Sequence, residues 1–597
     1  MLKFKMRLVD YIVETLSDVG LDSIFMVTGR GALYLTDAAA RCEKINTYSL
    51  HHEQSAVFAA SAYADYSDSI GCCIVSTGCG STNAITGVLN AWQDGIPLII
   101  LSGQHELRET TNYTGLPIRT YGQQQANIIE LVKPITKYAS MIKCKSKIRA
   151  EIERALFYSM EGRKGPVWLD IPLDLQSSII EPEQLEAFKS PLPDKSSFET
   201  QKFCKKLEYA IKNAKRPVVI VGSGIKASNN KKEFLEFVEK NRIPFVYTAS
   251  SCDFFDFHHP LNIGSVGVMG CSRSGAFCVQ NADLIIILGN RMNSMITGPD
   301  ATKFGRAAKI FMVDIDPNEA QKHNLNVNNF LNANLRSFFE NLNMHIVVNT
   351  TNEGWAEQCF IWKNKLPRIE TDLNDEKPID LHHLANTLSA TLSDQVIVTD
   401  SGTIELIMPN NLKHTGMSRH IHPTSQGSMG FCLGAAVGAA IASKKRVICI
   451  VGDGSIMMNI QELSMISYLN LPVSIIIISN GMYAVIRKRQ KELFRRRTIG
   501  TDVSNGVPSA DFKEISKAFN FDYTLIKNNG ALSKLPFVLN ADKPQIIEVN
   551  GLETQEYITT AHAKTKAGIY SLQPIEDQKP FIDREIFTAN MIIDPID

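Results

Sequence analysis

The stretch VICIVGDGS, residues 447–455, decides the expected fold. Its first five residues form a continuous apolar run rich in β-branched side chains, which is typical of a strand buried on both faces of a parallel sheet. Two glycines then permit a tight turn around Asp453. Beyond Ser455, apolar residues at helical spacing predict a helix that ends near Asn470. This order of strand, turn and helix indicates an open α/β sheet.

A second buried strand is predicted in VSIIIISNGM, residues 473–482, and it ends at Asn480. Open α/β sheets bind ligands at the carboxyl ends of their strands, so Asp453 and Asn480 are expected together at that edge. Mg²⁺ prefers octahedral oxygen ligation, which these two side chains and the carbonyl of Met482 would offer. A helix beginning at Ser455 would add N–H groups and a positive dipole end for a phosphate. Taken alone, the turn is equally consistent with Asp453 only capping a helix.

Composition narrows the class of protein. The 597 residues suggest three or four domains, and 62 basic residues balance 62 acidic ones, so no net charge favours nucleic acid or anionic lipid. The twelve cysteines form no CxxC pair and several lie in apolar runs, which is typical of reduced cysteines in a cytoplasmic protein. The first residues lack the apolar core of a signal peptide. No window reaches the roughly 20 apolar residues of a membrane span.

Apolar strands alternate with helices along most of the chain, which predicts an α/β fold of three doubly wound domains with parallel sheets. The stretches around 181–200 and 345–378 are predicted to be connectors. The polar tail is expected either to wrap the surface or to cover the site. The expected boundaries are an N-terminal domain at 1–180, a central domain at 200–345, a C-terminal domain at 378–560 and a tail at 561–597.

The GDGS turn followed by Asn480 and Gly481 closely resembles the thiamine diphosphate (ThDP) motif. Other segments resemble the ThDP-dependent decarboxylases and carboligases, nearest the acetolactate synthase branch. These segments are HHEQSA at 51–56, TGCGSTN at 77–83, KPITK at 133–137 and QGSMG at 426–430. The proline usual in the second segment is Cys79 here. The similarity covers about residues 8–555.

The resemblance implies that the N-terminal domain binds the aminopyrimidine of ThDP and the C-terminal domain binds its diphosphate and Mg²⁺. The site would lie between two subunits of a homodimer or homotetramer. Glu53 would donate to the pyrimidine nitrogen N1′, for which its carboxyl must be partly protonated, as burial promotes. Met429 would hold the bent cofactor, and the carbonyl of Gly427 would accept from the 4′-amine. The other implied residues are Asn83, Gly402, Thr403, Gly454, Ser455 and Met482 for the cofactor, Asp453, Asn480 and Met482 for the metal, and Gln124 and Lys137 on the substrate side.

Several of these residues also have a plain structural interpretation. Glu53 would otherwise complement a helix dipole, Met429 would be a core methionine and Lys137 a solvated surface lysine. Thr403 stands where acetolactate synthases commonly carry glutamine, so its phosphate contact departs from the family pattern. A catalytically inactive scaffold of the same fold is a further alternative, which the presence of the glutamate and the metal ligands argues against.

In the central domain, Gly222-Ser223-Gly224 follows a strand, but the acid expected after the next strand is missing, so an NAD site is rejected. Gly289-Asn290-Arg291 and Asp314-Ile315-Asp316-Pro317 instead resemble the flavin-binding segments of acetolactate synthases. Arg291 would clamp the phosphates of a non-redox FAD, with Asp314 near its adenosine end. The Asp316-Pro317 pair is also consistent with a simple turn.

Two departures concern the acceptor. Acetolactate synthases use an arginine for the acceptor carboxylate where this chain has Met295, which cannot pair with a charge, and a tryptophan where it has Arg489. The basic runs at 487–489 and 495–497 are consistent with a solvated helix face, or together with a larger anionic acceptor such as a nucleotide sugar. The expected reaction is decarboxylation of pyruvate and transfer of the acetyl unit to a ketone acceptor, as in the flavin-containing ThDP enzymes that build branched sugars such as yersiniose. Acetolactate synthase is the main alternative, followed by a plain decarboxylase or a hydrolytic C–C lyase.

Overall fold

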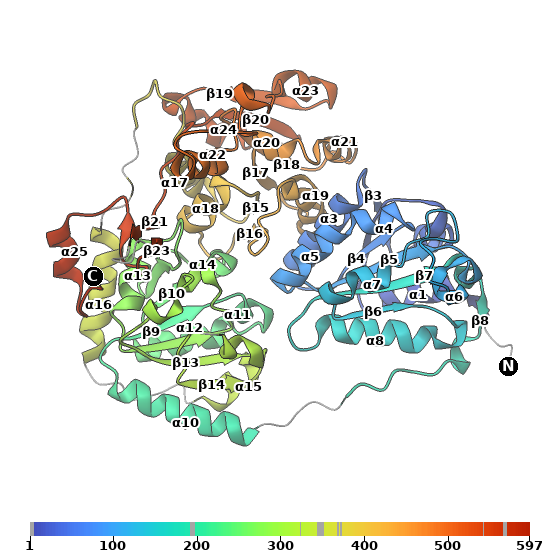
Figure 1. Cartoon of the computed structure of the whole chain (residues 1–597), viewed down its shortest axis with the longest axis horizontal. Coiled ribbons are helices and arrows are strands. Elements are labelled where there is room, and N and C mark those ends of the chain that lie inside the picture. Colours follow the sequence, from blue (N-terminus) through green and yellow to red (C-terminus); the bar gives the residue numbers. More distant parts are fainter. Residues whose placement is uncertain are drawn as a thin grey trace.

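The computed structural model contains three six-stranded sheets, one in each domain (Figure 1). It describes residues 5–191, 197–322, 324–342, 351–366, 369, 373–540, 543–564 and 570–596. Within the three sheets, neighbouring strands pair in parallel, and helices carry the chain from one strand to the next. Separate apolar clusters lie against the two faces of the sheets, which confirms the predicted doubly wound α/β fold.

The N-terminal sheet has the strand order β3-β2-β4-β5-β7-β6. Its strands are β2 (Ser23–Met26), β3 (Asn46–Ser49), β4 (Gly71–Val75), β5 (Leu98–Gln104), β6 (Tyr138–Met141) and β7 (Pro166–Pro172). The main helices around it are α1 (Leu8–Asp18), α2 (Leu33–Arg41), α3 (Glu53–Ser67), α5 (Ile85–Asp94) and α8 (Ile148–Met160). The residues of the edge strand β6 are mostly only partly buried and form no continuous apolar run, so the sequence gives little signal for this strand.

The central sheet has the order β11-β10-β9-β12-β13-β14. Its strands are β9 (Pro217–Val221), β10 (Phe245–Tyr247), β11 (Asn262–Ser265), β12 (Leu284–Leu288), β13 (Lys309–Asp314) and β14 (Asn329–Asn332). Its helices include α10 (Ser197–Asn213), α12 (Lys231–Asn241), α13 (Arg273–Gln280), α15 (Leu335–Asn341) and α16 (Thr351–Lys365). Helix α16 lies in the stretch predicted as a connector, and this part of the prediction is wrong. Its Trp355 and Trp362 are buried against the central domain, so it forms part of the core.

The C-terminal sheet has the order β16-β15-β17-β18-β20-β19. Its strands are β15 (Val396–Thr399), β16 (Arg419–Ile421), β17 (Val447–Gly452), β18 (Val473–Ser479), β19 (Asp522–Ile526) and β20 (Gln545–Asn550). Its helices include α17 (Leu381–Thr391), α18 (Thr403–Asn411), α19 (Phe431–Ser443), α20 (Asp453–Ile456), α21 (Leu463–Tyr468), α22 (Ala484–Leu493) and α23 (Phe512–Ala518). Helices α19 and α3 pack together (Figure 1). One cluster of apolar side chains runs from the N-terminal into the C-terminal domain.

The helix predicted from Ser455 to Asn470 is broken into α20, a 3₁₀ turn (Ile460–Glu462) and α21. The break falls at Asn459, whose backbone is non-helical (φ −137°, ψ 32°) and whose side-chain amide donates to the carbonyl of Gly430 at 2.8 Å. The apolar spacing still places Leu463 and Ile466 in the core, as predicted.

The tail packs on the central domain, where α25 (Arg584–Asn590) lies beside α16 (Figure 1). Glu576 accepts hydrogen bonds from Gln280 and Arg306, both at 2.7 Å. Trp362 donates to the side chain of Asn590 at 2.7 Å. Of the two expectations for the tail, these contacts support packing along the surface. Among the described residues, no helix combines the length and apolar character that a bilayer crossing requires.

Candidate active site

Asp453 and Asn480 lie side by side at the carboxyl ends of β17 and β18, as the sequence predicts. The two strands are hydrogen-bonded neighbours, with Gly452 opposite Ile478. The carboxylate of Asp453 accepts from the backbone N–H groups of Gly454, Asn480 and Gly481 at 2.8, 3.0 and 2.6 Å. The amide oxygen of Asn480 accepts from the N–H of Met482 at 3.2 Å. Burial raises the pKa of Asp453 although these donors oppose the shift, so a cation beside it would relieve an unfavourable buried charge.

Open space surrounds this arrangement of oxygen atoms. A Cβ added at Gly402, Gly452 or Gly481 would meet no atom within 4 Å. Gly402, with a φ of +81°, precedes α18, which begins at Thr403. The backbone of these turns can therefore approach a ligand closely. Gly454 differs, because a Cβ there would lie 2.2 Å from the ring of Tyr483.

The side chain of Ser455 is engaged within the protein rather than in the predicted diphosphate contact. Its hydroxyl donates to Asp400 at 2.5 Å and accepts from the N–H of Gly430 at 2.9 Å. Asp400 is fully buried at the end of β15 and also accepts from the N–H of Cys432 at 2.9 Å. Asp400 and Ser455 therefore join the GDGS turn to the segment that carries Gly427 and Met429. Because α20 has only four residues, few peptide dipoles add up at its N-terminus.

Glu405 was missed by the sequence analysis. It follows Gly402 by three residues on α18, and a Cβ at Gly427 would lie 2.8 Å from its carboxylate. Burial, reinforced by the charges of Asp400 and Asp94, raises the pKa of Glu405 to about 7. Its position beside Gly427 puts a titratable group next to the loop of the half-buried Met429. Glutamates are common in the first turn of a helix, so the sequence around Glu405 does not indicate that its side chain is buried.

Glu53, Asn83 and Gln124 come together at the carboxyl edge of the N-terminal sheet. Glu53 begins α3 and accepts from the amide of Asn83 at 3.0 Å. A Cβ at Gly80 would lie 3.2 Å from the Glu53 carboxylate, and one at Gly78 would lie 2.1 Å from the carbonyl of Gln124. Glu53 is only half-buried in the single chain, so the burial expected for it would have to come from a second subunit.

Lys137 lies apart from this group. It immediately precedes β6, and its N–H donates to the carbonyl of Pro166 at 2.8 Å, at the amino ends of the two strands. Its ammonium donates to the carbonyl of Glu161. Burial lowers the pKa of Lys137 to about 8. Lys137 is thus partly buried, and within one chain it is not brought to Glu53.

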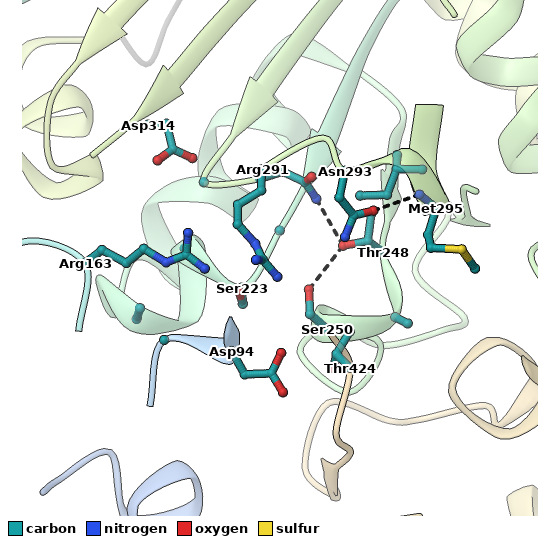
Figure 2. Close-up of a pocket in the computed structure, with 18 of the residues that line it drawn as sticks. Asp94, Arg163, Ser223, Thr248, Ser250, Arg291, Asn293, Met295, Asp314 and Thr424 are labelled. Carbon is teal, nitrogen blue, oxygen red and sulfur yellow. Dashed lines mark hydrogen bonds between the residues drawn. The ribbon is translucent and has the colours of Figure 1, made fainter. Parts of the chain in front are cut away.

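A cavity of about 220 Å³ opens at the carboxyl edge of the central sheet (Figure 2). The turns after its strands line it, and they include Gly222-Ser223-Gly224, Gly289-Asn290-Arg291 and Asp314. Arg291, whose pKa is lowered by burial, donates to the hydroxyl of Ser425 in the C-terminal domain, and the N–H of Ser425 donates to Asp94 of the N-terminal domain at 3.0 Å. Side chains of all three domains therefore meet at one wall of the cavity.

The two residues singled out for the acceptor lie in different places. Met295 is half-exposed and lines the central cavity, whereas Arg489 pairs with Glu492 on the exposed face of α22 at 3.3 Å. A second cavity, of about 390 Å³, lies between α22 and the segment before Tyr557. Both Thr403 and Met482 line it, together with the basic side chains Arg487, Lys488, Lys491 and Arg496.

Three family models match the chain in order. They describe the thiamine pyrophosphate enzyme N-terminal TPP binding domain at residues 6–131, its central domain at 204–342 and its C-terminal TPP binding domain at 400–549. The acetolactate synthase large subunit of Lactococcus lactis is 28% identical over 540 residues, which cover 90% of this chain and 91% of the relative. The probable acetolactate synthase large subunit of Methanococcus aeolicus is 28% identical over 568 residues, 90% of each chain. Acetolactate synthase 2 of Zea mays, described as chloroplastic, is 28% identical over 557 residues, 90% of this chain and 84% of the relative.

Proposed function

The chain belongs to the thiamine pyrophosphate enzymes, on their acetolactate synthase-like branch, and from this we propose that it decarboxylates pyruvate and transfers the two-carbon unit to a ketone acceptor. Bound ThDP supplies an electron sink for this chemistry, while the protein supplies orientation and electrostatics. The pairing of Asp453 with Asn480 at the ends of β17 and β18 is the observation that carries the proposal.

Mg²⁺ and the diphosphate fit the residues at this edge. The side-chain oxygens of Asp453 and Asn480 and the carbonyl of Met482 would hold the ion, which prefers oxygen ligands in octahedral geometry. The open backbone at Gly402 would face the phosphates. Thr403 lies at the start of α18 and would add a hydroxyl in place of the glutamine of the family pattern.

Glu53 would hold a proton against the pyrimidine nitrogen N1′, with Asn83 orienting its carboxylate. The half-exposed position of Glu53 supports a homodimer or homotetramer, because a second subunit would complete its burial. Met429, also half-buried, would pack against the cofactor, with the Gly427 carbonyl beside it. Gln124 would line the substrate side, and Lys137 would reach that side only through the neighbouring subunit.

We further propose FAD in the central cavity. Two glycine turns line it and pack directly against each other, since a Cβ at Gly222 would lie 2.2 Å from the Gly289 carbonyl. Arg291 offers a partly buried guanidinium for a bidentate phosphate contact. Asp314, buried at the end of β13, would face the adenosine end.

Four basic side chains line the cavity beside α22 against two acidic ones, Glu492 and Glu553, and this excess supports an anionic acceptor such as a nucleotide-linked keto-deoxysugar. Lys488 lies over the ring of Tyr557 at 4.5 Å, and Arg487 pairs with Asp502 at 2.8 Å, so both cations are held at the wall. Guanidinium and ammonium groups suit a diphosphate. Met295 cannot supply the charge that a small keto acid acceptor would need. Acetolactate synthesis is the second candidate, favoured by relatives that match over 90% of the chain.

One incubation distinguishes the two candidate reactions. The protein, loaded with ThDP and Mg²⁺, is given pyruvate with and without a nucleotide-linked keto-deoxysugar, and CO₂ and acetolactate are measured. We expect slow CO₂ release from pyruvate that accelerates with the sugar, and little acetolactate. Efficient acetolactate formation from pyruvate alone would establish the second candidate, and no CO₂ release under either condition would overturn both.

A further inference from the structure

Three buried side chains outside the proposed reaction converge where the central and C-terminal domains meet. They are Cys252, after the 3₁₀ turn Ala249–Ser251, His414, between α18 and β16, and His420 in β16. The sulfur of Cys252 and one ring nitrogen of each histidine all lie within 4.8 Å of one another. We propose that these three residues bind Zn²⁺ or another divalent cation of similar softness.

Two of the three spacings match a tetrahedral ion, and the third, between Cys252 Sγ and the His414 ring nitrogen, is within 4.8 Å. His420 Nδ1 lies 3.5 Å from Cys252 Sγ and 3.2 Å from His414 Nε2. With Zn–N of about 2.0–2.1 Å and Zn–S of about 2.3 Å, tetrahedral angles separate two nitrogens by roughly 3.3 Å and a nitrogen from a sulfur by roughly 3.5 Å. The ion would therefore fit with little movement of the ligands.

The other nitrogen of each ring already has an oxygen partner. His414 Nδ1 lies 2.8 Å from the hydroxyl of Ser418, and His420 Nε2 lies 2.8 Å from that of Thr399. Zinc-binding histidines use their second nitrogen in this way, which fixes the tautomer and orients the ring. Two independent hydroxyls therefore leave His414 Nε2 and His420 Nδ1 as the nitrogens that face the sulfur.

Binding of the ion would also change the charge at the site. Binding of the ion would convert the Cys252 thiol to a thiolate and release one proton to solvent, which leaves one net positive charge. The carboxylate of Asp253 lies next to it and accepts from the N–H of His420 at 2.8 Å and from Arg419 at 2.9 Å. The cluster of described residues supplies three ligands, which leaves one position of the tetrahedron to a ligand that these residues do not provide.

The ion would join a loop of the central domain to β16 of the C-terminal domain. The segment just before Cys252, at Thr248 and Ser250, lines the central cavity, as does His422 just beyond β16. Both walls would be fixed by the same ion. We therefore assign it a structural role that shapes the cavity, independent of the ThDP site.

The experiment uses the full chain with excess Mg²⁺, so that the oxygen ligands around Asp453 do not take up zinc. The protein is stripped with a chelator, supplied with Zn²⁺ and desalted, and the retained metal is measured by mass spectrometry. We expect about one zinc per chain. Cys252→Ser and His414→Gln should lose it, while Cys271→Ser, at another buried cysteine of the same domain, should keep it. Thr399→Val should weaken zinc binding by roughly 10- to 100-fold.

Cobalt binding gives a second, spectroscopic readout of the site. The Co²⁺-loaded wild-type chain should show the intense visible bands of a tetrahedral site and a thiolate-to-cobalt absorption, both absent in Cys252→Ser. Circular dichroism and ThDP binding verify that each variant is folded. No retained zinc and no thiolate band in the folded wild type would overturn the proposal and leave a hydrogen-bonded Cys–His–His chain. Equal zinc loss in Cys271→Ser would also contradict it.

Discussion

Gly438 of α19 packs on the backbone of Ala59 of α3. A Cβ at Gly438 would lie 1.9 Å from the carbonyl oxygen of Ala59, and one at Gly434 would lie 2.7 Å from that of Ser55. Two glycines one turn apart therefore let α3 of the N-terminal domain and α19 of the C-terminal domain approach to backbone contact. Glu53 at the start of α3 takes its position relative to the C-terminal sheet from this packing.

Gly438→Ala should lower the free energy of unfolding by about 1–3 kcal/mol, because the added methyl group must push the two helices apart. Chemical denaturation measures the change. Gly354→Ala in α16 is the control, since a Cβ there meets nothing within 4 Å. That variant should be neutral or stabilising by up to about 1 kcal/mol from helix propensity. Equal destabilisation by both would contradict the close packing.

Glu53→Gln should lower the rate of pyruvate decarboxylation by roughly 10²- to 10⁴-fold, the range of a lost acid–base group. ThDP binding, followed by fluorescence titration, should change little because the diphosphate contacts are untouched. Glu130→Gln, at an exposed glutamate of the same domain, is the control and should keep full activity. Retained activity in the Glu53 variant would remove this residue from the mechanism.

Asp453→Asn should weaken the binding of ThDP with Mg²⁺ more strongly than the roughly 10- to 100-fold typical for a residue that only orients a metal ligand. The amide keeps most of the shape but loses the charge that balances the ion. Calorimetric titration measures the affinity, with the exposed Asp394→Asn as control. Unchanged affinity would place the ion elsewhere.

Asp170 should make stability depend on pH. It is fully buried, accepts from Ser102 at 2.6 Å and from Gln104 at 3.1 Å, and burial raises its pKa to about 7. The folded state therefore holds a proton that the unfolded state, with a pKa of about 3.9, releases. Stability contributed by the protonated group is present below about pH 4 and is lost as the pH rises towards 7, by up to about 1.4 kcal/mol per pH unit. Denaturation curves of D170N should show a flatter slope over this window, and curves of the exposed variant D522N should not.

Arg291→Ala should reduce the flavin that the protein retains after purification or after incubation with FAD, by at least roughly tenfold if a bidentate phosphate contact is lost. ThDP binding should stay unchanged. Arg336→Ala, at an exposed arginine of the same domain, is the matched control. The visible absorption spectrum measures bound flavin, and equal retention by both variants would contradict the contact.

The sequence predicts the sheets well because short apolar runs rich in β-branched residues, such as residues 473–479, favour buried strands over helices. It also predicts that Asp453 and Asn480 meet, since parallel strands end at one edge. It does not predict Glu405, whose unusual pKa comes from residues of other segments that the fold brings to it. It misses α16 because the exposed apolar residues Phe360 and Ile361 lie outside the buried face formed by Trp355, Cys359 and Trp362 and obscure its helical spacing. The sequence also does not predict the Cys252–His414–His420 cluster, because Cys252 and His420 are 168 residues apart in the chain.

The cavity wall that contains Asp94, Arg291 and Thr424 has a thermodynamic consequence. Because each of the three side chains comes from a different domain, a molecule seated against them favours the assembled arrangement over any state in which one domain swings away. Binding of this ligand would raise the free energy of unfolding by RT ln(1 + [L]/Kd). Heating should then melt the ligand-bound chain in one cooperative step, while the empty chain would come apart in separate stages.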